Sequence, residues 1–126
     1  MAKSFRDLVV WQKGIQLSVL VYQLSKAFPR EDLYGLTSQM RRAAISVPSN
    51  IAEGAGRLNT LEYRQFLGIA RGSNFELQTH LTIARELGFG DANQIDSAER
   101  LSNEVGKMIF ATIATLNENR AVAAAH

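Results

Sequence analysis

The stretch SQMRRAAISVPSNIAEGAGR, residues 38–57, is the most informative part of this chain. It has the character of a helix, but polar residues recur in it where a helix should bury apolar ones. Pro48 lies in its middle and removes one backbone donor, which predicts a kink near Ala44–Pro48. A segment that breaks local rules in this way tends to mark a functional or structurally special site.

The sequence on either side of this stretch predicts three further helices and no strand. The four helices are expected at about residues 7–27, 32 or 36 to 57, 60–87 and 91–117, with Thr60 and Asp91 as caps. Because all connections are short, neighbouring helices should be antiparallel, in an all-α, up-down-up-down four-helix bundle. One domain should cover residues 1–126, with a flexible tail from about residue 119. The buried seam expected in the fourth helix consists of Ile95, Ala98, Leu101, Val105, Ile109, Ile113 and Leu116.

The first helix carries more apolar surface than one bundle seam needs. Its two apolar stripes are Val10, Leu17, Val21, Leu24 and Phe28, and then Leu8, Trp11, Ile15, Val19 and Tyr22. A helix this apolar is buried on more than one side, so we expect an interface in a homo-oligomer. A wide stripe that faces only the core is the alternative.

The composition is that of one ordinary domain, with 126 residues of which 46% are hydrophobic. There are no cysteines, which excludes disulfides and thiolate chemistry. The N-terminal sequence lacks the features of a signal peptide, and no apolar run approaches the roughly 18 residues of a membrane span. We therefore expect a cytoplasmic protein without a membrane partner.

The net charge of +2, from 14 basic and 12 acidic residues, does not by itself argue for nucleic acid. The distribution of the charges is uneven. Residues 33–85 contain six arginines and three acids, whereas residues 86–118 contain six acids and two bases. This asymmetry suits an anionic partner or complementary subunits, and a solvated mixed surface is the alternative.

A polar stripe on the second helix should face the third. If the chain reverses at residues 58–59, the numbers of facing residues sum to roughly 118 in an antiparallel hairpin. The expected pairs are Arg42 with Glu76, Ser46 with Gly72 and Asn50 with Gly68, and Glu53 continues the stripe. The glycines would form a groove for the serine and the asparagine, and the arginine would form an ion pair with the glutamate. Since buried polar groups must be paired, we expect a structural polar network, with a ligand pocket or a partner-binding face as alternatives.

Arginines recur at multiples of seven along the third helix, at Arg64, Arg71 and Arg85, with Gln78 at the missing position. A basic stripe of this kind can bind phosphates, and a solvated face is the alternative. The candidate nucleic-acid contacts are Arg41, Arg57, Arg64, Arg71 and Arg85.

Residues that catalysis would need are scarce. The histidines are His80 and His126, and Glu76 precedes His80 by four residues, the spacing of an ordinary helical pair. The chain lacks Glu-x-x-His motifs and zinc ligands, and its residues 53–57 lack the lysine and the spacing of a phosphate-binding loop. We therefore expect no enzymatic activity, no cofactor and no metal site.

Three groups of motifs resemble a known signature. They are SQMRRAAISV and SNIAEG at residues 38–47 and 49–54, FLGIARGS with Glu76-Leu77 at residues 66–77, and FRDL with VWQ at residues 5–12. Together they resemble the bacterial four-helix-bundle family encoded within 23S rRNA intervening sequences, over nearly the whole chain. The accessory protein of diversity-generating retroelements is a more distant relative.

This resemblance implies a homopentameric ring of bundles with no known enzymatic activity. The retroelement relatives have a basic barrel surface and bind a reverse transcriptase and nucleic acid. The expected function is therefore a non-enzymatic, homo-oligomeric scaffold or adaptor, with further copies of itself, RNA or DNA, and a protein as candidate partners. The alternative is a small-ligand-binding bundle that uses the polar region between the second and third helices.

Overall fold

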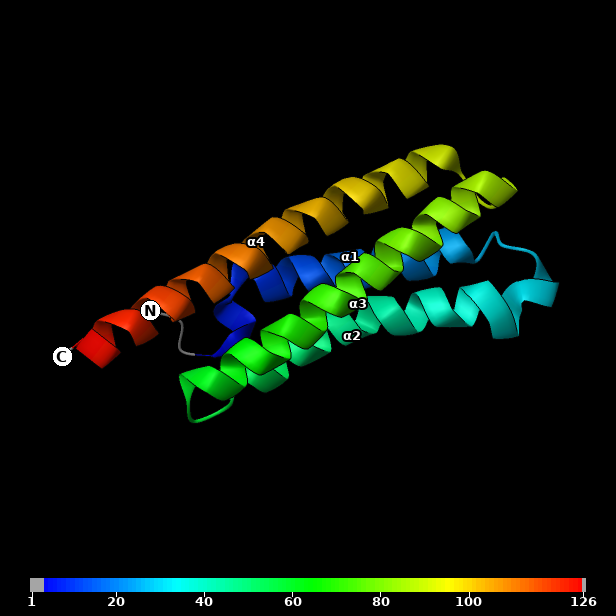
Figure 1. The fold of residues 1–126 in the computed structure, drawn as a ribbon. Coiled ribbons are helices and arrows are strands. Elements are labelled where there is room, and N and C mark those ends of the chain that lie inside the picture. Colours follow the sequence, from blue (N-terminus) through cyan, green and yellow to red (C-terminus); the bar gives the residue numbers. More distant parts are fainter. Residues whose placement is uncertain (1–3, 126) are drawn as a thin grey trace.

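The computed structural model describes the backbone of residues 4–125 and the side chains of residues 4–119. The fold consists of four α-helices, and no strand lies within the described backbone. The helices are α1 (Val9–Ser25), α2 (Ser38–Ala55), α3 (Thr60–Leu87) and α4 (Ala92–Ala125), as Figure 1 shows. The predicted all-helical fold of four helices is confirmed.

Short helical turns precede α1 and α2. A 3-10 turn, η1 (Phe5–Asp7), leads into α1. A second 3-10 turn, η2 (Arg30–Asp32), and a π-helical turn, η3 (Leu33–Thr37), lead into α2, which therefore begins later than predicted. Gly35 within η3 has non-helical backbone angles, so a regular α-helix starts only after it.

The caps of α3 and α4 follow from short polar side chains. Asn59, and not Thr60, is the N-cap of α3, because its Oδ1 atom accepts the backbone N–H of Glu62 at 2.9 Å. Asp91 caps α4 as predicted, and its Oδ1 atom accepts the backbone N–H of Asn93 at 2.7 Å.

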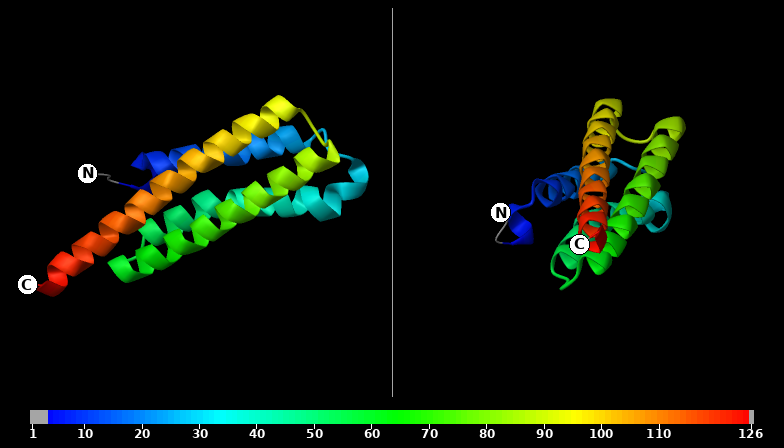
Figure 2. Two further views of the ribbon diagram at one scale, coloured as in Figure 1. Left: turned by 45° about the horizontal axis from the view of Figure 1, so that its top comes forward. Right: turned by 60° about the vertical axis from the view of Figure 1, so that its left-hand side comes forward.

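The fourth helix is the longest element and continues to Ala125, so the expected end near Asn117 was too early. Four of its last five residues are alanines, which have the highest helix propensity. Figure 2 shows this end of α4 projecting past the other helices. The flexible tail expected from about residue 119 falls largely on side chains outside the described ones and stays a prediction.

The connections lie at the two ends of the bundle. Residues 56–59 join α2 to α3 at one end, and residues 26–37 and 88–91 make the other two connections at the opposite end (Figure 1). α1 packs mainly against α2 and α4, and α3 packs against the same two helices, so α1 and α3 lie diagonally across the bundle. Within the described residues, none of the helices combines the length and the apolar character that crossing a membrane requires.

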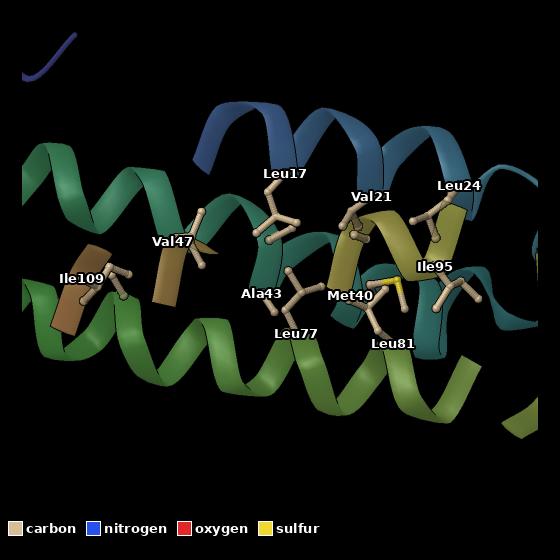
Figure 3. Close-up of a cluster of buried hydrophobic side chains, with 14 of the residues drawn as sticks. Leu17, Val21, Leu24, Met40, Ala43, Val47, Leu77, Leu81, Ile95 and Ile109 are labelled. Atoms are coloured by element: carbon tan, nitrogen blue, oxygen red, sulfur yellow. The ribbon is translucent and has the colours of Figure 1, made fainter. Parts of the chain in front are cut away.

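One hydrophobic core fills the space between the helices (Figure 3). The first predicted stripe of α1 lies in this core, with each of its five side chains at most 7% exposed. In α4 the predicted seam is buried at Ile95, Ala98, Val105 and Ile109, whereas Leu101, Ile113 and Leu116 pack against the edge of the core.

A close contact between α1 and α2 surrounds Pro48. α2 continues through this proline as one α-helix, although the missing N–H leaves the Ala44 carbonyl without its helical donor. The Ser18 hydroxyl of α1 lies 3.0 Å from that carbonyl oxygen and 3.0 Å from the Gly14 carbonyl oxygen, so it can donate to the freed group. A Cβ atom on Gly14 would lie 3.2 Å from the Cβ atom of Pro48, and only glycine permits this approach without displacement.

A close contact between α2 and α3 lies at Gly54. A Cβ atom there would lie 2.7 Å from the Cβ atom of Phe66 and 3.2 Å from the Tyr63 carbonyl oxygen. Burial at this contact raises the pKa of the Tyr63 hydroxyl. Gly54 therefore allows α3 to pack onto the last turn of α2.

The Ser18 contact should contribute measurably to stability. Ser18→Ala leaves the buried Ala44 carbonyl without a donor, which should lower the free energy of unfolding by about 1–3 kcal/mol. Pro48→Ala returns a backbone N–H to this carbonyl, so Ser18→Ala should cost less in that background. Urea denaturation of the four proteins measures the coupling, and an equal cost in both backgrounds would contradict the assignment.

Alanine at Gly54 should destabilise the chain by about 1–3 kcal/mol through overpacking, despite the better helix propensity of alanine. Gly68→Ala is the matched control, because a Cβ atom there meets nothing within 4 Å. It should leave a single protomer unchanged or stabilise it by up to about 1 kcal/mol. Thermal unfolding under monomeric conditions compares the two, and an equally stable Gly54→Ala variant would argue against the close contact.

Candidate functional site

The polar residues of α2 meet α3 at a pair of serines. The Oγ atoms of Ser46 and Ser73 lie 2.8 Å apart, and Asn50 Nδ2 donates to the Ser46 carbonyl and hydroxyl oxygens at 2.8 and 2.9 Å. Ser73 stands where the sequence interpretation placed Gly72, a difference of one residue in register. Because these half-buried groups bond to one another, the arrangement favours a structural role over a ligand pocket.

The charged members of the expected network do not join this cluster. Arg42 is exposed, and no carboxylate of the described side chains lies within 4.0 Å of it, so the predicted ion pair with Glu76 does not form. Glu76 instead lies 3.9 Å from His80 Nε2, and Glu53 lies 2.7 Å from Arg57. Four-residue steps advance by about 40° around a helix, so a stripe at this spacing winds away from α3.

The predicted glycine groove does not form within the protomer. Gly68 and Gly72 are exposed on α3, and a Cβ atom at either position would meet nothing within 4 Å. The glycine that admits a neighbouring helix is Gly54, on α2. Gly54 lies in the motif SNIAEG, but its role in packing could not be told from the sequence, because a glycine near the end of a helix often serves only to end it.

A buried polar pair that the sequence analysis missed joins α3 to α4. Ser102 Oγ donates to Asn74 Oδ1 at 2.7 Å, and Asn74 Nδ2 donates to the Ser102 carbonyl at 2.9 Å. Both residues are at most 1% exposed. The sequence does contain one sign of this pair, because Asn74 occupies a position of α3 that its neighbours on the same face, Ala70 and Leu77, mark as apolar.

The stripe of residues spaced by seven along α3 follows α4. Arg64 Nη1 donates to Asn117 Oδ1 at 3.0 Å, and Gln78 Nε2 donates to Ser102 Oγ at 2.9 Å. Arg71 lies over the ring of Phe75, on α3, and over the ring of Phe110, on α4. Both helices are labelled in Figure 1. Seven residues are about two helical turns, so the spacing marks a helix–helix seam here.

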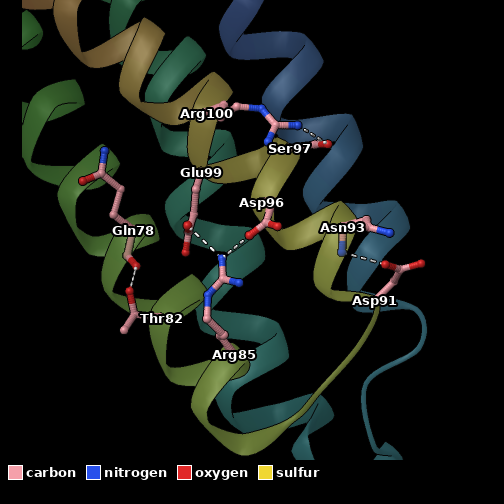
Figure 4. A network of polar contacts seen from close by, with 9 residues as sticks. All are labelled: Gln78, Thr82, Arg85, Asp91, Asn93, Asp96, Ser97, Glu99 and Arg100. Atoms are coloured by element: carbon pink, nitrogen blue, oxygen red, sulfur yellow. Dashed lines mark hydrogen bonds and ion pairs between the residues drawn. The ribbon is translucent and has the colours of Figure 1, made fainter.

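Arg85 is held by two carboxylates of α4 (Figure 4). Its Nη2 atom lies 2.7 Å from Asp96 Oδ1 and 2.8 Å from Glu99 Oε2. Hydrogen bonds to Glu99 and to Asp96 raise the pKa of the Arg85 guanidinium. The positive charge of this candidate nucleic-acid contact is therefore already compensated within the chain.

The other two candidate arginines also have partners. Arg41 Nε donates to Ser25 Oγ at 2.8 Å, and its guanidinium lies 4.8 Å from the centre of the Tyr22 ring. Arg57 forms its ion pair with Glu53 and lies 4.7 Å from the centre of the Phe66 ring. Among the described side chains, no carboxylate neutralises the charge of Arg41, whereas Glu53 neutralises that of Arg57.

A groove of about 410 Å³ lies on the outer surface between α3 and α4. Its lining consists of Arg71, Asn74, Phe75, Gln78, Asn103, Gly106, Lys107 and Phe110. The lining combines two cations, two exposed aromatic rings and three amides. Of this group only Arg71 was expected as a nucleic-acid contact, and Gln78 was expected only to share its stripe on α3, because the groove forms through the packing of two helices.

Apolar side chains remain exposed on the side of α1 next to α2. Ile15, Val19 and Tyr22 are 38%, 51% and 40% exposed, and Ile45 of α2 is 44% exposed. These four residues, hereafter the α1 face, include three members of the second stripe predicted for the first helix. Leu8 and Trp11, the other members, pack against the edge of the core.

No group of three or more potential metal ligands comes together among the described side chains. His80 is buried, and its Nδ1 atom has no hydrogen-bond partner there. Its only carboxylate neighbour within 4.0 Å in the described part of the chain is Glu76, one helical turn away.

Comparison with known proteins places the chain in a family. Residues 6–111 match the family described as 23S rRNA-intervening sequence protein. A crystal structure of a protein with unknown function from the S23 ribosomal protein family of Bacteroides thetaiotaomicron has a similar fold, with a TM-score of 0.77 and 23% sequence identity over 83% of this chain and 98% of that chain. No curated protein matches the chain. Since the family match extends over most of the sequence, the chain belongs to the 23S rRNA-intervening sequence protein family.

Proposed function

We propose that this protein is a non-enzymatic scaffold or adaptor built from antiparallel, up-down-up-down bundles that assemble into a ring-like homo-oligomer. Five copies are the number that the family resemblance implies. The observation that carries the proposal is a pair of unpartnered helix faces on opposite sides of the protomer. The relation to the retroelement accessory protein belongs to the same proposal.

The first of these surfaces is the α1 face. Ile15, Val19 and Tyr22 turn outward because the opposite side of α1 is occupied by the core, and its Gly14–Ser18 side lies against Pro48 of α2. Ile45 extends the apolar surface onto α2. A contiguous exposed apolar surface of this kind is typical of a protein interface.

The second surface is the outer side of α3, centred on Gly68 and Gly72. A glycine inside a helix costs about 1 kcal/mol relative to alanine, and neither glycine has a neighbour in the protomer that requires it. Ile69 and Ile83 of α3 are exposed as well. The bare backbone at the two glycines suits the close approach of a helix from another copy.

The placement of the two faces favours a ring. α1 and α3 lie diagonally across the bundle, so the surfaces point in roughly opposite directions. An interface between two different surfaces is heterologous, and such contacts build a closed ring when the rotation between copies closes. The α1 face of one copy would then cover the glycines of the next.

The polar contacts between α3 and α4 support the antiparallel topology. As the residue number rises on α3 from Arg64 to Arg85, the number of its partner on α4 falls from Asn117 to Asp96. The same trend between α2 and α3 would place Ser46 opposite Ser73 and Gly54 opposite Tyr63, in agreement with their contacts.

RNA or DNA is the proposed partner of the assembled protein. Of the five candidate arginines, Arg41, Arg64 and Arg71 have no carboxylate within 4.0 Å among the described side chains, whereas Arg57 and Arg85 do. A ring repeats these three charges in every copy, which would compensate for the small net charge of one chain. A protein partner on the same ring is a further part of the proposal.

Assembly should depend on both faces. Val19→Asp places a charge on the α1 face, and Gly72→Leu fills the surface on α3 without a clash inside the protomer, so each should shift the protein toward monomer. Gln16→Asp, on an exposed part of α1, is the matched control and should keep the assembly. Size-exclusion chromatography with light scattering measures the mass. A wild-type protein that is strictly monomeric would overturn the proposed ring.

Binding of RNA or DNA should be dominated by phosphates. Affinity should fall by roughly tenfold or more when salt rises from about 50 to 200 mM, if three or more phosphates are contacted. Charge reversal by Arg64→Glu and Arg71→Glu should weaken binding, whereas Arg100→Glu, which replaces an exposed arginine of α4, should change it little. Fluorescence anisotropy with labelled oligonucleotides measures these effects. Absent or salt-independent binding by the assembled protein would remove the nucleic-acid part of the proposal.

A further inference from the structure

The geometry of the groove between α3 and α4 points to a binding site for one nucleotide, and we propose that it holds the base on Phe75 and Phe110 and the phosphate on Arg71 and Lys107. The nucleotide can be free or part of a single strand. This inference deepens the proposed function at Arg71, and only its oligonucleotide form rests on the nucleic-acid partner proposed above.

The groove exists because of Gly106. A Cβ atom on this residue would lie 3.1 Å from Asn74 Nδ2, so α4 approaches α3 closely and leaves no side chain above the contact. Asn74 is held below by Ser102 and forms part of a rigid floor. The resulting volume of about 410 Å³ is within the range of small-ligand sites.

The two cations at the groove have no acidic partner in the part of the chain that the structure describes. Neither Arg71 nor Lys107 has a carboxylate within 4.0 Å among the described side chains. Glu99, an acid of the same seam, lines a neighbouring hollow with Gln78 and is already bound to Arg85. The Arg71 end of the seam is therefore where an anion would be attracted.

The aromatic rings are unusually exposed for their size. Phe75 is 49% exposed and Phe110 is 60% exposed, so neither serves mainly as core. The Arg71 guanidinium lies 4.9 Å from the centre of the Phe75 ring and 6.0 Å from that of Phe110. The rings and the planar guanidinium that lies over them together form a platform on which a planar base can stack, while its phosphate reaches the cations.

An amide pair at the groove can contact the edge of the base. Gln78 Nε2 donates to Asn103 Oδ1 at 3.3 Å, which leaves Gln78 Oε1 as an acceptor and Asn103 Nδ2 as a donor. Neither remaining atom has a hydrogen-bond partner among the described side chains. A neighbouring donor and acceptor match the alternating groups on the edges of nucleobases.

The test is titration of the full-length protein with adenosine 5′-monophosphate, followed by calorimetry or by NMR of labelled protein. Adenosine and ribose 5-phosphate, which lack the phosphate and the base respectively, should each bind at least about tenfold more weakly. Phe110→Ala and Arg71→Ala should each weaken nucleotide binding by about tenfold, and Phe110→Tyr should retain it. Leu58→Ala and Arg100→Ala are matched controls for loss of an exposed apolar or basic side chain.

The assignment would be overturned if wild-type protein did not bind the nucleotide at millimolar concentrations. It would also be overturned if folded Phe110→Ala and Arg71→Ala proteins bound the nucleotide as well as the controls. Equal affinity for ribose 5-phosphate would also overturn it, because the base would then contribute nothing. A single-stranded oligonucleotide that competes with the mononucleotide identifies the strand as the source, and no competition identifies the free nucleotide. If the protein assembles or binds RNA but does not bind the nucleotide, only the proposed nucleotide site is overturned. If a monomeric protein, such as the Val19→Asp variant, binds the nucleotide, the proposed site stands without the ring.

Discussion

A buried proline inside α2 imposes the constraint on which the arrangement of α1 and α2 depends. Pro48 leaves the Ala44 carbonyl without a helical donor, and a buried carbonyl cannot remain unpaired without cost. Ser18 supplies a hydroxyl to that carbonyl, and Gly14 lets the helices approach closely enough for it to reach. This contact and the core stripe of α1 face the inside of the bundle. Ile15, Val19 and Tyr22, on the other side of the helix, point out of the protomer.

The rest of the bundle uses the same means of packing. At Gly54 and at Gly106 the missing side chain lets a neighbouring helix approach, and beside Gly106 the polar groups of Asn74 and Ser102 bond to one another across the helices. These small residues do not require a special backbone angle, since they lie inside regular helices. Their role is steric. Gly68 and Gly72 lack such a neighbour, and this difference is the basis for proposing that another copy covers them.

Electrostatics divide the seam between α3 and α4 into two parts. At one end Arg85 is neutralised by Asp96 and Glu99, which joins the helices without leaving charge for a partner. Further along, Arg71 lies on exposed aromatic rings and keeps its charge. Arg71 and Arg85 belong to the same stripe of arginines, so the sequence does not distinguish them. Their different environments come from the α4 residues opposite them, and only one of these environments is a candidate binding site.

Much of the fold could be predicted from local pattern. The stripe of α1 that contains Leu17 and Val21 is buried as its periodicity indicated, and Asp91 starts α4, because both depend on neighbours within the same helix. The predicted pairing of Arg42 with Glu76 and the predicted groove at Gly72 are absent from the structure. Both depend on the register and rotation of two helices, which local pattern does not determine. A register difference of one residue turns a side chain by about 100°. It replaced Gly72 by Ser73 as the neighbour of Ser46.

The sequence alone therefore determined the all-helical class, the inner face of α1 and the family signature. Tertiary structure decided which glycines admit a neighbour, which arginines keep their charge and where a groove opens. The physical reason is that helix formation and amphipathicity are properties of residues within a few turns of one another. Close packing and charge compensation are properties of residues that meet only when the helices assemble.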